Sequence, residues 1–196
     1  MRFISEIKYF LTLSFLLLGV STSSLFAQEI SVPIDVQIDI LPKILSLNKS
    51  FDLENSNTTI KVGILYSSVL RNSEKVKNEI QTQTAESNLK IRKANVNFIP
   101  IDVSKTKDIK SYLTQNNISV LYFAPLRGYD IASISKICKE EQIITFTGVS
   151  SFMDESDISV GFELQDNKLK ITINLESAKA EGANFSSRLL SLSKVK

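Results

Sequence analysis

Apolar and polar residues form alternating blocks along the middle of the chain. Short apolar runs occupy residues 60–67, 93–103, 118–125 and 143–148, and between them apolar residues recur at helical spacing. Continuous apolar runs of this length are typical of strands buried on both faces. The alternation therefore predicts an α/β fold in three layers, with a mostly parallel sheet flanked by helices. Ser104 is the expected N-cap of the helix that follows the second run.

The pattern changes after residue 157, where apolar residues alternate strictly with polar ones in two consecutive runs. Asp166 and Asn167 lie between the runs, and this residue pair tolerates the backbone of a tight turn. The sequence therefore predicts a C-terminal antiparallel hairpin added to the parallel sheet. Its apolar face comprises Val160, Phe162, Leu164, Leu169, Ile171 and Ile173.

The last segment has apolar residues at spacings of three and four, which predicts a long terminal amphipathic helix starting near Asn174. Such a stripe packs along a sheet or against another subunit. Gly182 costs about 1 kcal/mol of helix propensity relative to alanine, and is best tolerated where another backbone comes close. Ordinary core packing and a dimer or partner interface both remain open. The candidate interface residues are Gly182, Phe185, Leu189 and Leu192.

Residues 1–27 have the organisation of a secretory signal peptide. A basic start is followed by the apolar run Phe10–Val20 and then by small and polar residues up to Ala27. An uncleaved membrane anchor is the alternative, but the apolar run is shorter than the roughly 20 residues that span a bilayer. We therefore expect cleavage after Ala27 and a periplasmic or otherwise secreted protein.

Residues 28–59 are expected to form a helical segment and a loop that belong to the same globular domain as residues 60–196. Val36, Ile40, Ile44 and Leu47 fall on one helical stripe. Pro42 interrupts this stripe and is expected to kink the helix or divide it into two pieces, because proline lacks the backbone donor that a helix interior requires.

The charge balance argues against nucleic acid as a partner. The chain has 23 basic and 21 acidic side chains, whereas phosphate binding needs a concentrated basic face. The densest basic runs, 89–93 and 105–110, are interpreted as parts of a solvated surface. Cys138 is the single cysteine, so no disulfide can form within the chain. Its position on an apolar helical face indicates a buried small residue rather than a redox thiol.

The composition also excludes the commonest kinds of catalytic site. The chain contains no histidine, and therefore lacks the usual general base and metal ligand. No glycine-rich phosphate loop follows the first apolar run. The acidic run 153–157 lacks the alternating ligands and the turn glycine of a calcium loop. We therefore expect no enzymatic activity, no metal and no cofactor.

Polar residues that follow the apolar runs could still form a binding site. Open α/β sheets bind ligands at the carboxyl ends of their strands. A small anionic or aromatic ligand could bind there through Arg127 and the ring of Tyr129, although the same residues could serve only as turn formers. The candidate ligand-binding residues are Tyr66, Ser67, Ser68, Arg127, Tyr129 and Ser150.

The end of the chain resembles the C-terminal signature of YfiR-like periplasmic proteins. The resemblance rests on Ile173-Asn174, on the small residues Ala178, Ala180 and Gly182, and on the run from Ser186 to Leu192. The stretches "SVLYFAP", "IITFTG" and "GFELQDNKLKITIN" also resemble that family in their order. The likeness extends over roughly residues 61–195.

This resemblance implies a secreted α/β domain that acts by binding. In the best known proteins of the family, the domain represses a membrane-bound diguanylate cyclase from the periplasmic side. An outer-membrane lipoprotein releases this repression, and cyclic-di-GMP signalling changes accordingly. The resemblance thus implies a regulatory protein with a membrane or outer-membrane partner, and a homodimer is compatible with it. The alternative is a periplasmic small-ligand receptor associated with transport.

Overall fold

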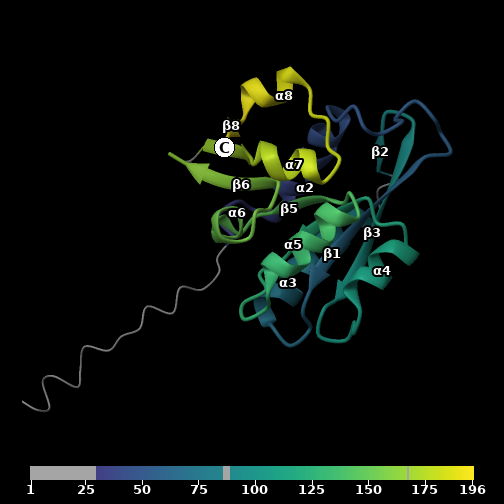
Figure 1. Ribbon diagram of the computed structural model, residues 1–196. Helices are drawn as coiled ribbons and strands as arrows, with labels where there is room; N and C mark the ends of the chain where they lie inside the picture. The colour runs from purple at the N-terminus through teal and green to yellow at the C-terminus, as the bar shows by residue number, and fades with distance from the viewer. Residues whose placement is uncertain (1–29, 86–88, 167) are drawn as a thin grey trace, which may run out of the picture.

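The computed structural model describes residues 30–85, 89–166 and 168–196. The predicted signal peptide and Asn167 of the predicted hairpin turn lie outside these ranges. Figure 1 shows helices on both faces of a central sheet, which confirms the predicted α/β architecture.

The strands of the described residues form one eight-stranded sheet, in the order β2-β3-β1-β4-β5-β6-β7-β8. The pairs β3–β1, β1–β4, β4–β5 and β5–β6 are parallel, and β6–β7 is the predicted antiparallel hairpin. The short strands β2 and β8 were not predicted. The bounds are β1 Thr59–Tyr66, β2 Lys90–Ile91, β3 Ala94–Asp102, β4 Val120–Phe123, β5 Ile144–Thr147, β6 Val160–Gln165, β7 Lys168–Ile173 and β8 Lys194–Val195.

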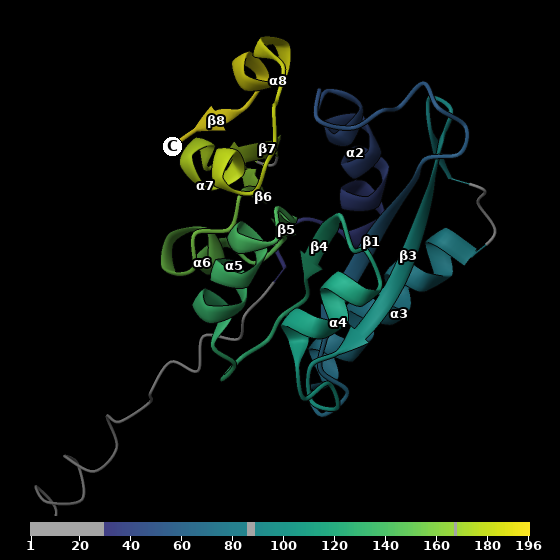
Figure 2. The same cartoon turned by 45° about the vertical axis from the view of Figure 1, so that its right-hand side comes forward.

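The helices divide the apolar core into two clusters, one on each face of the sheet. α2 and α3 contribute to the first cluster, and α4, α5 and α6 contribute to the second. Figure 2 shows the two groups of helices on either side of β1 and β4. Within the described ranges no helix is both long and apolar enough to span a bilayer. The bounds are α2 Ile34–Ser46, α3 Arg71–Ala85, α4 Ile109–Gln115, α5 Ile131–Glu140, α6 Ser150–Glu155, α7 Leu175–Ala180 and α8 Ser187–Leu192.

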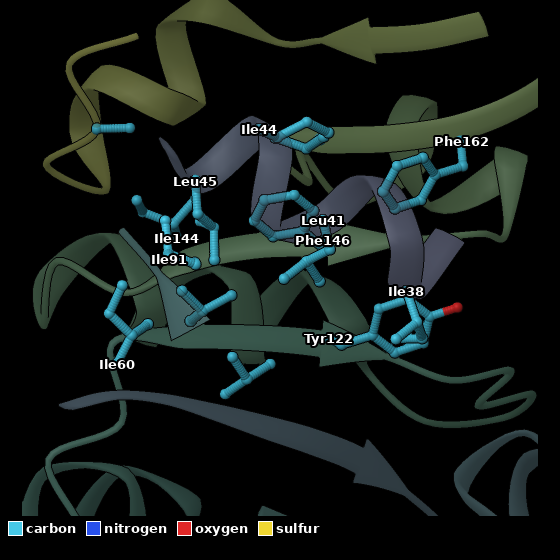
Figure 3. Packing of buried hydrophobic residues seen from close by; sticks show 14 of the residues in the cluster. Ile38, Leu41, Ile44, Leu45, Ile60, Ile91, Tyr122, Ile144, Phe146 and Phe162 are labelled. Atoms are coloured by element: carbon cyan, nitrogen blue, oxygen red, sulfur yellow. The ribbon is translucent and has the colours of Figure 1, made fainter. Parts of the chain in front are cut away.

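Helix α2 provides the apolar cover over the middle of the sheet. Leu41, Ile44 and Leu45 are almost completely buried, and Figure 3 shows Leu41 close to Phe146 and Leu45 close to Ile144. Full burial of side chains of this size contributes about 1.5–3 kcal/mol each. The sheet thus holds α2 mainly through apolar packing.

A buried polar contact fixes where α2 sits along the sheet. The Gln37 side chain accepts a hydrogen bond from the Tyr122 hydroxyl at 2.8 Å and donates one to the Val32 carbonyl at 2.7 Å. Gly148 lies so close that a Cβ on it would stand 2.5 Å from the Gln37 Nε2 atom. The absence of a side chain at residue 148 therefore makes room for this contact at the end of β5.

Two local expectations need correction. Pro42 lies inside α2 and does not divide it, since the helix runs from Ile34 to Ser46. We attribute this to the buried residues on both sides of the proline, since their packing offsets the missing backbone bond. The residue that caps α4 is Asp108, which accepts a hydrogen bond from the Ser111 N–H at 2.9 Å. Ser104 instead donates to Asp102, the last residue of β3.

The expected long terminal helix is two short helices, α7 and α8. Gly182 has a φ of +78°, a left-handed conformation that ends α7. Ser186 then caps α8 by accepting a hydrogen bond from the Leu189 N–H at 3.3 Å. Apolar residues keep their spacing of three and four across this break, which explains why the sequence of the segment resembled that of one helix.

Glu181 ties the C-terminal segment to the starts of two parallel strands. The Thr145 N–H and hydroxyl donate to its carboxyl oxygens at 2.8 and 2.7 Å, and the Ser159 hydroxyl donates to the same group. Burial raises the pKa of Glu181 to about 7, and the hydrogen bonds from Ser159 and Thr145 oppose that shift. Lys139 lowers this pKa slightly, and Glu181 in turn helps to raise the pKa of the neighbouring Cys138 thiol.

This pKa predicts that stability falls as the pH rises. A carboxyl whose pKa is higher in the folded than in the unfolded chain stabilises the fold at low pH, and that contribution is lost as the pH passes through about 7. The loss is at most about 3 kcal/mol. The free energy of unfolding would be measured with denaturant at pH 5 and at pH 8.5. Glu181→Gln should abolish the part of its decrease that Glu181 causes. Glu176→Gln on the exposed side of α7 is the control. If the free energy of unfolding depended on pH equally in both variants, Glu181 would not be the source of the decrease.

The contact between Gly148 and Gln37 predicts a coupled pair of substitutions. Gly148→Ala should lower the free energy of unfolding by about 1–3 kcal/mol, because its new methyl group overlaps the Gln37 amide. In the Gln37→Ala background the same change should cost clearly less, with a coupling of about 0.5–3 kcal/mol. Urea unfolding of the four proteins in the cycle measures this, and additive effects would show that the two residues are not in contact.

Candidate functional site

The parallel strands create a topological switch point beside β1. The chain passes from β1 to β3 on one side of it and then crosses to β4 on the other side. Loops leaving the carboxyl ends of β1 and β4 therefore diverge, and this is where open α/β sheets usually bind ligands. We call the loop residues at these strand ends the rim: residues 66–70 after β1, 102–105 after β3, 125–130 after β4 and 147–150 after β5.

Ser67 and Tyr129 join the two sides of the switch point. Ser67 is fully buried, and its hydroxyl lies 2.9 Å from the hydroxyl of Tyr129. The Ser67 N–H donates to the Ser73 hydroxyl at 3.0 Å, which fixes the loop against the first turn of α3. Two of the predicted site residues are thus in direct contact, although they are far apart in sequence.

Asp102 braces the next pair of loops. One of its carboxyl oxygens accepts from the Ser68 N–H at 3.2 Å and from the Ser104 N–H and hydroxyl at 3.1 and 2.6 Å. The other oxygen lies 3.1 Å from the Lys105 ammonium. The predicted residue Ser68 is therefore held by a carboxylate from the neighbouring strand.

Electrostatics keep this carboxylate charged. Burial alone would raise the pKa of Asp102, but the hydrogen bonds from Ser104, Ser68 and Lys105 outweigh burial and hold its pKa far below the ordinary value. Burial, and then the nearby Asp102 charge, raise the pKa of Tyr66. The Lys77 ammonium lies 5.1 Å from the centre of the Tyr66 ring. Tyr66 is thus a neutral, half-buried phenol at the edge of the rim.

The remaining predicted rim residues are not gathered into one pocket. Arg127 is exposed in the turn before Gly128, which has a φ of +83°. Ser150 is also exposed and begins α6 after β5, two strands away from β1. Val69, at the tip of the loop after β1, is 73% exposed. The rim is therefore a surface with a braced floor and an exposed cation and apolar side chain.

A hollow of about 300 Å³ lies next to the rim, between the start of α2 and α3. Its lining includes Val32, Asn72, Lys75 and Pro125. None of the six predicted ligand-binding residues lines it. The hollow is connected to the Ser67–Tyr129 contact by the loop after β4, which contains both Pro125 and Tyr129.

The four candidate interface residues differ in their accessibility. Phe185 and Leu189 are 8% and 3% exposed and belong to the first core cluster, whereas Leu192 is 71% exposed. Gly182 is half-buried against Gln142. Figure 2 shows α7, α8 and β8 grouped at one end of the molecule. Only Leu192 of these four therefore offers a large side chain to another molecule.

Sequence reasoning missed Asp102, Gln37 and Glu181. Asp102 had one available signal, because an acidic residue ended an apolar run and was followed by a serine-containing loop. Gln37 and Glu181 had none, since each is polar in a helical segment where exposed polar residues are common. Only the packing of α2 and α7 against the sheet buries them.

The rim carries several polar and charged side chains. It offers hydroxyl groups, the hydrogen-bonded carboxylates of Asp102 and Asp130, and the exposed guanidinium of Arg127. The described residues contain no cluster of side chains suited to hold a metal ion. No rim hydroxyl in these residues has an imidazole or a neutral amine beside it that could act as a general base.

Solved structures share the fold at low sequence identity. Three bacterial chains each align with 84% of this chain and 60% of their own length. They are a conserved domain protein from Vibrio cholerae (12% identity, TM-score 0.58), an ABC domain in complex with L-Trp from Streptococcus pneumonia (14%, 0.57), and CD0873, a substrate binding protein with adhesive properties from Clostridium difficile (14%, 0.51). This chain thus spans about three fifths of the chains that it resembles.

No curated protein matches the sequence. A family model described as YfiR/HmsC-like does match, over residues 55–194. The match begins just before β1 and ends at the start of β8, so it takes in the parallel sheet, the hairpin and both terminal helices. This agrees with the resemblance found in the closing segment, and the chain belongs to the YfiR/HmsC-like family.

Proposed function

We propose that this protein is a periplasmic, non-enzymatic regulator that acts by binding a membrane-associated protein. Family membership supports the regulatory role and the location, and the predicted signal peptide at residues 1–27 supports export. The finer proposal is that the partner is a membrane-bound diguanylate cyclase, which the protein represses, so that it controls cyclic-di-GMP signalling.

The observation that carries this proposal is the internal bracing of the rim. The Ser67–Tyr129 contact and the Asp102 hydrogen bonds hold the loops after β1, β3 and β4 together within the free protein. Loops that are already ordered lose little conformational freedom on binding. The exposed side chains of Val69 and Arg127 project from this braced floor and supply apolar contact and charge.

Small-ligand binding is the second candidate function. The structures that share this fold include a protein bound to L-Trp and a substrate binding protein. The switch point beside β1 and the adjoining hollow of about 300 Å³ offer a place for a compact ligand. On this reading, ligand binding near Tyr129 would act alongside partner binding at the same rim.

Rim substitutions should weaken partner binding selectively. The periplasmic domain of a membrane diguanylate cyclase from the same organism would be purified and titrated with residues 28–196 by calorimetry. Val69→Asp and Arg127→Glu should each raise the dissociation constant at least tenfold, because both side chains are exposed at the rim. Lys179→Glu on the exposed side of α7 is the control, and Leu192→Asp, as exposed as Val69, tests whether the end of α8 forms the interface instead. Binding that is absent from the wild type, or lost only in Leu192→Asp, would contradict the proposal.

A ligand at the rim should stabilise the protein against heat. Melting temperatures would be measured with a panel of amino acids that includes L-Trp. A true ligand present at a hundred times its dissociation constant should add about 2.7 kcal/mol to the free energy of unfolding. Tyr129→Ala should remove the gain, and Tyr112→Ala on α4 is the control. The absence of any gain across the panel would leave partner binding as the single proposed function.

A further inference from the structure

The outer edge of β3 is open along most of its length. β3 pairs with β1 over eight residues, from Asn95 to Asp102. On its other side it pairs with β2 only through Ala94 and Asn95. No other strand of the described chain pairs with that side. The edge beyond Val96 is therefore free for another strand.

The backbone bonds show which groups face outward. The Asn95 and Val103 N–H groups donate to Thr58 and Tyr66 on the β1 side, whereas the Val96 N–H donates to Leu89 on the β2 side. The backbone N–H and carbonyl groups of successive strand residues point to opposite sides of the strand. Those of the even-numbered residues of β3 therefore point away from β1. Phe98 thus presents a free N–H and carbonyl, and Pro100 presents a carbonyl without an N–H.

A cavity adjoins this same stretch of backbone. It has a volume of about 490 Å³ and is lined by Gln81, Thr84, Leu89 and residues 95–98, together with Ala85. Val96 and Phe98 are half-buried there, so the cavity has an apolar floor with polar amide walls. An added strand would place alternate side chains over this floor. Backbone pairing and side-chain pockets together are the features of recognition by strand addition.

The charge along the edge is positive at both ends. Lys90, Arg92 and Lys93 lie at the start of β3, and Lys105 and Lys107 follow its end. Glu54 pairs with Arg92 and Lys93, and Asp102 pairs with Lys105. Within the described ranges no acidic side chain forms an ion pair with Lys90 or Lys107. The two basic runs that the sequence showed separately are therefore brought to the two ends of one strand edge.

These charges disfavour a second copy of the chain as the occupant. Two β3 edges paired antiparallel would bring the basic start of each strand to the basic end of the other. Like charges in that position repel, and a proline in each edge would remove further bonds. Pro100 and the lysines thus protect the edge against self-pairing while leaving the Phe98 groups available.

We propose that the β3 edge binds an extended acidic segment of a partner protein by strand addition. The segment pairs with the N–H and carbonyl of Phe98 and with the carbonyl of Pro100. Its inward side chains are apolar and cover Val96 and Phe98, and its carboxylates lie near Lys90 and Lys107. This surface runs along the side of the sheet and meets the rim only at residues 102–105, and the inference goes beyond the proposed function.

The test uses random twelve-residue peptides displayed on phage and selected on residues 28–196, followed by synthesis of the enriched peptides. They should be acidic, with alternating β-branched or aromatic residues. Pro100→Ala restores an outward donor and should tighten binding about three- to tenfold, the effect of one added hydrogen bond. Phe98→Pro should abolish peptide binding, because proline removes the outward N–H. Phe98→Ala should only weaken it, because alanine keeps this N–H and loses only the ring.

Further variants separate the proposal from its rivals. Lys90→Glu combined with Lys107→Glu should weaken binding at least tenfold, and Lys179→Glu on the exposed side of α7 should leave it unchanged. Circular dichroism checks that each variant folds. The proposal is overturned if no acidic peptide is enriched, or if the Pro100 and Lys90/Lys107 substitutions leave the affinity for the peptide unchanged. It is also overturned if sedimentation shows that a second copy of the chain covers the edge.

Discussion

The parallel pairing of β1 with β3 on one side and β4 on the other is the constraint on which the rest of the structure depends. It buries β1 between two layers of helices, so Val62, Ile64 and Leu65 are inaccessible to water. It also sends successive connections in opposite directions from β1. The loops at the strand ends therefore diverge at one place, and the chain must brace them there with side chains, chiefly Ser67, Tyr129 and Asp102.

Three buried or partly buried polar side chains position parts of the fold. Gln37 sets α2 along the sheet, Asp102 links two loops, and Glu181 holds the C-terminal segment to the starts of β5 and β6. Each one is hydrogen-bonded to backbone or hydroxyl groups, as buried polar side chains must be if they are not to cost stability. A molecule built in this way presents ordered surfaces, which suits a protein that acts by binding.

The sequence predicted the strands and the hairpin because their signals are local. Continuous apolar runs marked β1, β3, β4 and β5, and strict alternation marked β6 and β7 to within a few residues. The break between α7 and α8 was missed because Gly182 sits at a spacing that also suits a helix, and only its positive φ ends α7. At Pro42 the sequence suggested a break that the structure does not have, since the buried residues around the proline keep α2 continuous. Of the candidate site, Ser67 and Tyr129 do meet, but Ser150 stands two strands away.

The sequence by itself determined the α/β class, the alternation of strands and helices, and the absence of histidine chemistry. These follow from residue type and short-range spacing. The tertiary structure alone decided the order of the strands, the burial of Gln37 and Glu181, and the open outer edge of β3. Those features depend on contacts between residues far apart in the chain, and no local pattern encodes which distant segment will pack against a given helix or strand.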